Sequence, residues 1–212
     1  GNIGKNYAEI RSLGVSPGDF GIYKDIYAYE GNTLGNHFGS ANIFWEGHAP
    51  GLFFGYQTAG IVQVEDLPAN GGSYNVTQDL NNGVPQAGDI KFVDQNGDGI
   101  INTDDRVVIG DPNPKFTYGF QTKFTWKGLS ISAQFNGVYG NELLNTNLRY
   151  QAIPNRAGGN IRTESWQQAW TPENRSNAYP RVDYTIPAGV FDMYVEDASF
   201  LRCSDITISY SI

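Results

Sequence analysis

The sequence predicts an all-β protein in which antiparallel strands are joined by long loops, with one short helix near residues 161–170. Aromatic residues make up 14% of the 212 residues, and glycine accounts for 26 of them, which is typical of strands and turns. Residues 115–137 alternate between apolar and polar side chains with a period of two. Stretches rich in Asn and Gly separate the apolar segments and predict surface loops.

Charge and cysteine content exclude several classes of protein. The 14 basic and 22 acidic residues give a formal net charge of −8, which argues against a nucleic-acid partner. A single cysteine, Cys203, excludes a disulfide framework or a Cys-based zinc cluster, and we expect it to pack within an apolar strand. The histidines, His37 and His48, offer little for a His-built metal site. No phosphate-binding or catalytic motif occurs, so we expect no enzymatic activity.

The first 90 residues have a mixed pattern. Residues 7–13 predict a short strand, and residues 51–56 and 60–63 predict short buried strands interrupted by glycine. An interior glycine in a strand marks a bulge or the close approach of another backbone. Aromatic residues in this region can stack on sugar rings, although packing in a core is the favoured interpretation. They are Tyr27, Tyr29, Trp45, Phe53, Phe54 and Tyr56.

Residues 94–105 match the spacing of a calcium-binding loop, which places side-chain oxygens at positions 1, 3, 5, 9 and 12 and glycine at position 6. The expected ligands are Asp94, Asn96, Asp98, the backbone carbonyl of Ile100, Asn102 and Asp105. Gly99 permits the sharp turn, and Ile101 anchors the loop on apolar neighbours. We therefore expect Ca²⁺ in a structural role, against the alternative of an Asn/Asp/Gly turn that binds no metal. No long helices flank the loop, so an EF-hand pair is not expected.

Residues 115–137 give the clearest pattern, a hairpin with one apolar and one polar face around a turn at Lys127–Gly128. Each strand has about ten residues, the length that crosses a bilayer when tilted. A soluble sandwich hairpin would show the same pattern. Further on, Thr163 is the expected cap of the helix, Trp166 and Trp170 share one of its faces, and Thr171–Pro172 end it.

The last strand is predicted over residues 195–212. Its apolar positions change phase near Ser204 and Asp205, which predicts a β-bulge. The strand pattern is still running where the sequence stops, so we expect the chain to be a segment of a larger protein.

Several motifs, in order, resemble the SusC/RagA-type outer-membrane proteins over roughly residues 40–212. The most specific runs from Gly88 through the calcium-type loop to Gly110 and continues into Asp111–Phe120. The others are Gly51–Ile61, Phe135–Asn141, Trp170–Asn174, Tyr179–Arg181 and Val195–Arg202.

This resemblance implies part of a TonB-dependent transporter with a 22-stranded outer-membrane barrel. The segment would come from the later part of the barrel, without the N-terminal plug that contacts TonB and without the final strands. The family imports glycans, or peptides in some members, with a SusD-like lipoprotein, in the outer membrane of Gram-negative bacteria. We expect oligosaccharide or peptide as the ligand, and no nucleic acid; the sequence does not identify the substrate-binding residues.

The same resemblance implies a division of the chain. Residues 1–114 would be mainly an extracellular loop region with the calcium-type loop, and residues 138–194 a second such region with the short helix. Residues 115–137 would be a barrel hairpin and residues 195–212 a barrel strand, with Trp126 suited to an aromatic girdle. The alternative is a secreted, calcium-stabilised β-module that binds carbohydrate. The two hypotheses differ in whether the apolar face of the hairpin is exposed or buried.

Overall fold

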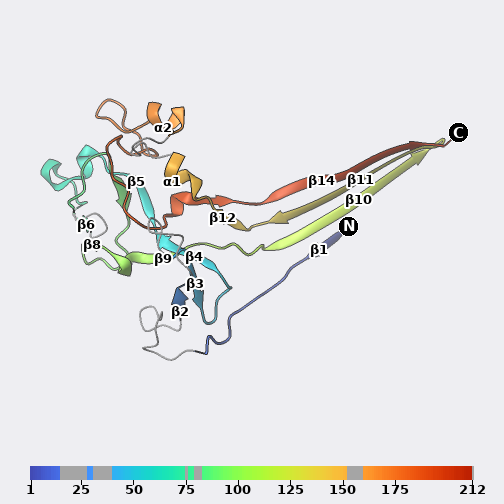
Figure 1. The fold of residues 1–212 in the computed structure, drawn as a ribbon, viewed down its shortest axis with the longest axis horizontal. Coiled ribbons are helices and arrows are strands. Elements are labelled where there is room, and N and C mark those ends of the chain that lie inside the picture. The colour runs from blue at the N-terminus through green and yellow to red at the C-terminus, as the bar shows by residue number, and fades with distance from the viewer. Residues whose placement is uncertain (15–27, 31–39, 75, 79–82, 152–159, 212) are drawn as a thin grey trace.

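The computed structural model describes residues 1–14, 28–30, 40–74, 76–78, 83–151 and 160–211. A long sheet projects from a body of loops and short strands (Figure 1). The sheet has the order β1–β10–β11–β14, and all its pairings are antiparallel. Its strands are β1 (Asn2–Gly4), β10 (Phe116–Trp126), β11 (Leu129–Tyr139) and β14 (Phe200–Tyr210).

The predicted hairpin is confirmed and extends two residues further than expected, to Tyr139. Strands β10 and β11 pair without interruption from Phe116 opposite Tyr139 to Trp126 opposite Leu129. Lys127 and Gly128 form the turn with φ values of 43° and 85°. Positive φ at both central residues matches the right-handed twist of the flanking strands, which is why a two-residue hairpin turn requires it.

The predicted bulge in β14 is also confirmed. Gln134 pairs with Asp205 and Phe135 pairs with Cys203, so the register shifts and no residue of β11 lies opposite Ser204, although its hydroxyl donates to the carbonyl of Gln134 at 3.2 Å. The expectation that Cys203 packs inside an apolar strand is wrong, because its side chain is exposed. Cys203 follows the apolar phase of β14, but that face of the sheet is not covered by other described residues.

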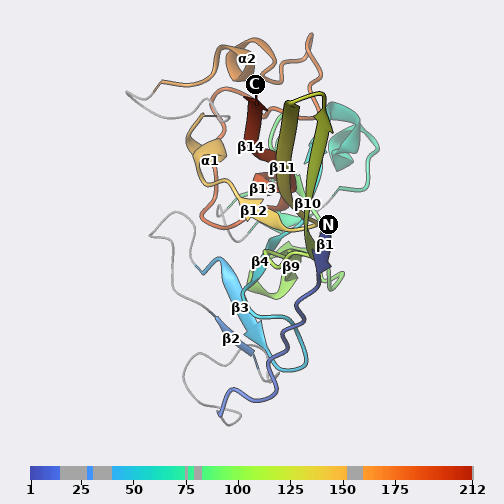
Figure 2. The same ribbon diagram turned by 90° about the vertical axis from the view of Figure 1, so that its right-hand side faces the viewer.

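Both long connections leave the sheet at the same end. Residues 5–115 join β1 to β10, and residues 140–199 join β11 to β14. Because these strand pairs are antiparallel, the two connections meet where β10 begins and β11 ends; we call their described residues the loop body. Figure 1 shows it gathered at one end of the sheet, with the turn of the hairpin and the C-terminus at the other, and Figure 2 looks along the sheet from the side of the C-terminus.

The loop body contains short strands and helices. Its four-stranded sheet joins β2 (Ala28–Glu30), β3 (Asn42–Trp45), β4 (Leu52–Tyr56) and β9 (Arg106–Gly110). Strand β5 (Thr58–Ile61) pairs with β7 (Ile90–Phe92) in antiparallel orientation. A second antiparallel pair joins β12 (Glu142–Leu144) and β13 (Val195–Asp197). Strands β6 (Thr77–Gln78) and β8 (Ile100–Ile101) pair in parallel. The α-helices are α1 (Asn147–Gln151) and α2 (Thr163–Gln167). The structure is therefore mostly antiparallel β with a few short helices.

Residues from both connections form the main hydrophobic core. The first connection contributes Tyr56, Ile61, Ile90, Phe92 and Ile101, and the second contributes Trp170, Tyr184, Val190, Phe191 and Tyr194. The rings of Phe92 and Phe191 meet edge to face at 5.0 Å, a favourable geometry for aromatic pairs. The burial of Ile101 confirms its predicted role as the anchor of the 94–105 loop.

The glycine within β4 allows the two connections to meet. A Cβ on Gly55 would lie 2.1 Å from the carbonyl oxygen of Val190, closer than any side chain tolerates. The next residue, Tyr56, donates its backbone N–H to that same carbonyl at 2.8 Å. The register of β4 against β9 also shifts between Phe53 and Phe54. The predicted meaning of this interior glycine, a bulge or a close backbone approach, is thus confirmed on both counts.

Two local predictions are wrong. Residues 7–13 form no strand, and β1 lies earlier, at Asn2–Gly4. The helix covers only Thr163–Gln167 with Arg162 as its N-cap, so Thr163 is the first helical residue rather than the cap. Trp166 is exposed on this helix, whereas Trp170 lies beyond its end and is buried in the core. The two tryptophans therefore share no helix face, because tertiary packing outweighs the four-residue spacing.

Candidate functional site

The long sheet has one face that carries no charged side chain. The register places Ile3, Phe120, Phe124, Ile131, Ile206 and Ile208 on this face, together with Trp126 and Tyr210 near the turn. These side chains are exposed: Ile206 is 65% accessible and Ile208 is 67% accessible. A soluble protein buries such a face, so this surface requires an apolar environment outside the described chain.

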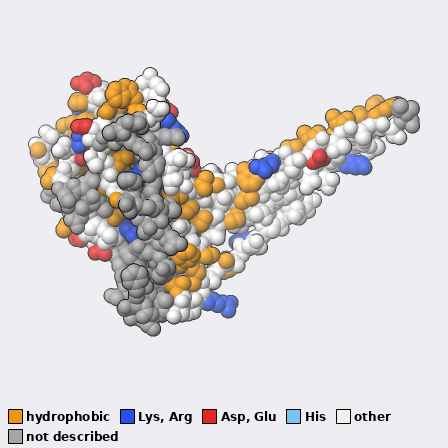
Figure 3. Space-filling model, in the orientation of Figure 1, with side chains coloured by type: hydrophobic (Ala, Val, Ile, Leu, Met, Phe, Trp, Pro, Cys, Tyr) orange, Lys and Arg blue, Asp and Glu red, His pale blue; other side chains and the backbone are white. Residues whose placement is uncertain are grey.

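The opposite face of the sheet is polar. The register aligns Gln121, Lys123, Ser132, Gln134, Asn136, Arg202, Asp205 and Thr207 on it. In Figure 3 the long sheet presents a largely polar surface to the viewer, and hydrophobic side chains gather along its upper edge, where β14 runs. A hollow of about 520 Å³ lies over β1, β10 and β11 around Gly119.

The strand lengths and the position of aromatic residues fit a membrane-spanning sheet. Each of the three long strands has 11 residues, so each is about 33 Å long and spans about 25 Å at a tilt of about 40°. That height equals the apolar band of an outer-membrane barrel. Trp126 is 59% exposed beside the turn, where an aromatic girdle would lie. None of the helices in the described part of the chain is long and apolar enough to cross a membrane.

The 94–105 loop folds around its own carboxylates. Asp94 accepts the N–H of Gly97 at 2.7 Å and that of Gly99 at 2.8 Å. Asp105 is fully buried and accepts the N–H groups of Gln95 and Asn102 at 2.8 and 2.9 Å. The backbone N–H of Gly99, followed by that of Gly97, lowers the pKa of the Asp94 carboxyl. Asp94 therefore stays ionised at neutral pH.

The remaining expected ligands lie in the same loop. Asp98 accepts the N–H of Ile100 at 2.8 Å, and Asn96 accepts the N–H of Asp98 at 2.9 Å. Asn102 caps the turn Thr103–Asp105 by accepting the N–H of Asp104. Carboxylate, amide and carbonyl oxygens are the hard donors that calcium takes, and each carboxylate retains lone pairs beyond these bonds. Within the described residues, however, no group of three or more His, Cys, Asp or Glu side chains is placed to hold a metal ion.

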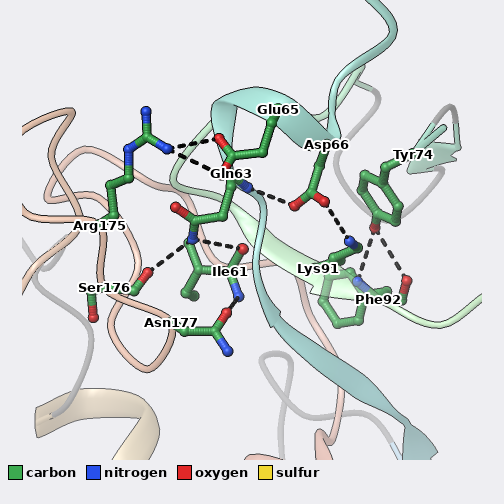
Figure 4. Close-up of polar contacts among 10 residues, drawn as sticks. All are labelled: Ile61, Gln63, Glu65, Asp66, Tyr74, Lys91, Phe92, Arg175, Ser176 and Asn177. Atoms are coloured by element: carbon green, nitrogen blue, oxygen red, sulfur yellow. Dashed lines mark hydrogen bonds and ion pairs between the residues drawn. The ribbon is translucent and has the colours of Figure 1, made fainter. Parts of the chain in front are cut away.

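Polar contacts join the two connections beside their shared core, and Figure 4 shows part of this network. Asn177 accepts the N–H of Ile61 at 3.0 Å, and Gln63 donates to the carbonyl of Ser176 at 3.1 Å. Arg175 pairs with Glu65 at the surface at 3.0 Å. Arg181 forms a more buried pair with Asp89 at 2.7 Å. The sequence did not indicate these pairs, because the partners are far apart in the chain and belong to no motif.

Three of the six aromatic residues considered for sugar stacking pack inside the protein. Phe53, Phe54 and Tyr56 are buried, and Trp45 is partly exposed and stacks on His48 at 4.2 Å between ring centroids. Tyr27 lies outside the described residues, as does the side chain of Tyr29. The core interpretation is therefore correct for the three aromatic residues of β4.

Comparisons with known proteins agree with the motifs. No family model matches the sequence. The chain is 37% identical over 127 residues to TonB-dependent receptor P26 and 31% identical over 174 residues to TonB-dependent receptor P3, both of Formosa agariphila. These matches cover 59% and 80% of the chain. TonB-dependent receptor SusC of Bacteroides thetaiotaomicron is 27% identical over 128 residues, or 57% of the chain.

The fold has a solved counterpart in the structure described as the RagAB peptide importer in the open-open state. The match has a TM-score of 0.58 at 22% identity and covers 98% of this chain and 19% of that one. The chain is a partial segment of the SusC/RagA-type TonB-dependent receptors. It spans 13%, 16% and 11% of the lengths of P26, P3 and SusC.

Membership of the SusC/RagA type bears on two expectations from the sequence. TonB-dependent receptors are outer-membrane proteins of Gram-negative bacteria, which confirms the expected location. The family consists of transporters and not enzymes, which confirms the expectation of no enzymatic activity.

Proposed function

We propose that this chain supplies one section of the wall of a 22-stranded transport barrel, together with two extracellular loops. The amphipathic long sheet carries the proposal. Its charge-free face would contact lipid and its polar face would line the lumen. Edge strands β1 and β14 would pair with neighbouring barrel strands, since a barrel removes unpaired edges.

The orientation follows from the connections. Outer-membrane barrels have short periplasmic turns and long extracellular loops. The two-residue turn at Lys127–Gly128 would therefore be periplasmic, and the loop body would lie outside the cell. The shared core makes this body a preformed surface on which a SusD-like lipoprotein could close. Import of an oligosaccharide or a peptide would be powered by TonB, acting on parts of the receptor that precede this segment.

The alternative, a secreted β-module that binds carbohydrate, requires the apolar face of the hairpin to be buried in a sandwich. Phe124 and Trp126 of that face are instead 60% and 59% exposed. The described residues include no second layer that covers it. The exposed face thus favours the transporter segment over the secreted module.

Cysteine labelling of the receptor that carries this segment tests the orientation. In a Cys203→Ser background, Glu173→Cys places a thiol on the loop body and Ser211→Cys places one beside the hairpin turn; both positions are exposed. A membrane-impermeant maleimide should label Glu173→Cys on intact cells, and Ser211→Cys only after the outer membrane is opened. The reverse pattern would overturn the orientation. Uptake of labelled oligosaccharides and peptides, with and without TonB, tests the transport.

We also propose that the 94–105 loop binds Ca²⁺ through Asp94, Asn96, Asp98, the carbonyl of Ile100, Asn102 and Asp105. The spacing, the hard oxygen donors and the ionised Asp94 support this assignment. Since the carboxylates already cap backbone N–H groups, the ion would tighten a loop that is folded by its own hydrogen bonds. The role would be structural, holding the surface of the loop body in place.

A further inference from the structure

The hairpin turn contains a lysine where turn chemistry favours another residue. Lys127 has a φ of 43° and is the one described residue other than glycine with a positive φ. Asn, Asp and Gly tolerate this left-handed conformation, and Asn-Gly is a preferred pair in a two-residue hairpin turn. Lysine gains nothing from the backbone at this position. The turn therefore points to a role for the lysine side chain itself.

The Lys127 side chain reaches the end of the charge-free face of the sheet. Its ammonium lies 5.1 Å from the centre of the Trp126 ring, and Trp126 belongs to that face. The negative face of an indole attracts a cation, which holds the ammonium there. No carboxylate among the described residues forms an ion pair with Lys127. The positive charge is thus available to an anion at the tip of the sheet, away from the loop body (Figure 1).

Two exposed aromatic rings lie on the charge-free face beside this lysine. Trp126, Leu129 and Tyr210 form one row across three neighbouring strands. Trp126 and Tyr210 are 59% and 68% exposed, and they lie two strand spacings, or about 10 Å, apart. The indole N–H and the phenol hydroxyl can donate hydrogen bonds, while the rings provide apolar contact area. The row therefore combines an apolar surface with hydrogen-bond donors and one cation.

This combination fits the headgroup of a lipid. Tryptophan and tyrosine collect at the level of headgroups, where one end of the ring meets hydrocarbon and the other meets water. A lysine beside them attracts negative charge, which a lipid phosphate supplies. A sugar carries no charge for the lysine, and a free phosphate makes no use of the apolar rings. A phospholipid uses both, because its acyl chains continue along the apolar face.

We propose that Trp126, Lys127 and Tyr210 bind an anionic phospholipid of the periplasm-facing leaflet, with its phosphate at the Lys127 ammonium and its acyl chains along the charge-free face. The inference rests on the proposed function, which supplies the lipid-facing side and the leaflet. It adds the class of lipid and the residues that select it. Phosphatidylglycerol carries a net negative charge and should bind more tightly than phosphatidylcholine, whose quaternary ammonium offsets the same phosphate.

Photo-crosslinking of the receptor that carries this segment, reconstituted in phosphatidylcholine vesicles, tests the site. The probes are trace amounts of phosphatidylglycerol and phosphatidylcholine, each with a diazirine near the glycerol end of one acyl chain. Adducts are mapped by mass spectrometry. We expect fragments that contain Trp126 or Tyr210 to give about fivefold more adduct with the phosphatidylglycerol probe, and less as salt screens the lysine. Equal yields from the two probes would overturn the proposal.

Three variants isolate the contribution of the lysine. Lys127→Asn removes the charge and suits the turn, so the receptor should fold as well as the parent while the headgroup preference is lost. Lys127→Arg keeps a cation and should keep the preference. Lys123→Gln removes the same charge from the polar face of β10 and should leave the preference within about twofold. A preference retained in Lys127→Asn, or lost equally in Lys123→Gln, would overturn the proposal.

The positions of the adducts separate this proposal from the proposed function. Adducts from both probes along the charge-free face, without a headgroup preference at the turn, would overturn the lipid site and leave the barrel wall standing. Absence of adducts along that face in a folded receptor would overturn both. Soluble glycerol phosphate should not compete with the phosphatidylglycerol probe. Competition would assign the site to a free phosphate ester and overturn the assignment to a lipid.

Discussion

Comparing a lysine on one face of β14 with a lysine on the other face tests whether the sheet faces a membrane or water. Ile206 and Thr207 are consecutive, so their side chains point to opposite faces. Ile206 lies near the middle of the strand opposite Ala133, which in turn faces Thr122 on β10. Thr207 lies opposite Ser132 on the polar face and contacts Asp205 at 2.9 Å. The variants Ile206→Lys and Thr207→Lys therefore place a positive charge on opposite faces of the sheet at nearly the same position along the strand.

The expected magnitude follows from that depth. In the proposed barrel the sheet would span about 25 Å, so position 206 would lie close to the bilayer midplane, where a lysine on the lipid face costs about 2–4 kcal/mol. This cost corresponds to a loss of about 30-fold to 1,000-fold in the folding equilibrium. A lysine at position 207 would face the lumen, with the Asp205 carboxylate beside it. Its expected effect is within about 1 kcal/mol.

The assay is denaturant unfolding of the receptor in lipid vesicles, followed by the heat-dependent shift in electrophoretic mobility that marks a folded barrel. The amount of folded receptor in isolated outer membranes gives a second reading. We expect Ile206→Lys to lower the unfolding midpoint and the folded fraction, and Thr207→Lys to match the parent. Equal effects of the two lysines would refute the assignment of the apolar face to lipid.

Three further predictions concern the loop body. Calorimetry with Ca²⁺ should give a binding signal in the parent receptor and in Asp104→Ala, but none in Asp98→Ala. An unchanged signal in Asp98→Ala would contradict the ligand assignment. Arg181→Ala should destabilise the loop body by about 2–4 kcal/mol because it leaves Asp89 buried without its partner, whereas Arg175→Ala removes an exposed pair and should cost less than about 1 kcal/mol in thermal unfolding. Burial raises the pKa of Tyr194 to about 12. The folded state therefore favours the neutral phenol, and this contribution to stability, about 2–3 kcal/mol, is complete below pH 10 and is lost as the pH rises from 10 to 12. Melting temperatures measured across that pH range should fall less steeply in Tyr194→Phe than in the parent, and parallel curves would contradict this role of Tyr194.

The hairpin could be predicted from the sequence because its determinants are local. Alternation along β10 and β11 specifies the faces, and Lys127–Gly128 specifies the turn, so no distant contact is needed to fix the register. The bulge at Ser204 was visible for the same reason, as a change of phase within one strand. The division of the chain into loop and barrel regions stays a prediction, although β1 pairs with the hairpin and β14 begins at Phe200.

The loop body could not be predicted because contacts between distant residues determine it. Trp170 appeared to belong to a helix face, but its indole N–H donates to Gln63 at 3.0 Å, and the ring joins the core. Asp192 resembled any loop aspartate, yet it fixes both the N–H and the hydroxyl of Thr58. Neither position carries a pattern in its own neighbourhood. For the calcium-type loop, the spacing gave the turn and the anchor Ile101, and the metal stays a proposal.

The distribution of buried residues determines how the two parts depend on the membrane. The core lies in the loop body, while the described side chains of β10, β11 and β14 are at least partly exposed. In the proposed barrel the long sheet would therefore draw its stabilisation from lipid and from neighbouring strands, whereas the loop body draws its own from the contacts between the two connections. Ile206→Lys should therefore lower the amount of folded receptor without altering the loop body, whereas Arg181→Ala should loosen the loop body in a receptor that still inserts. Antibody or protease probes of the loop body on intact cells would separate these outcomes, and a loop body that unfolds whenever the sheet fails would contradict this division of stability.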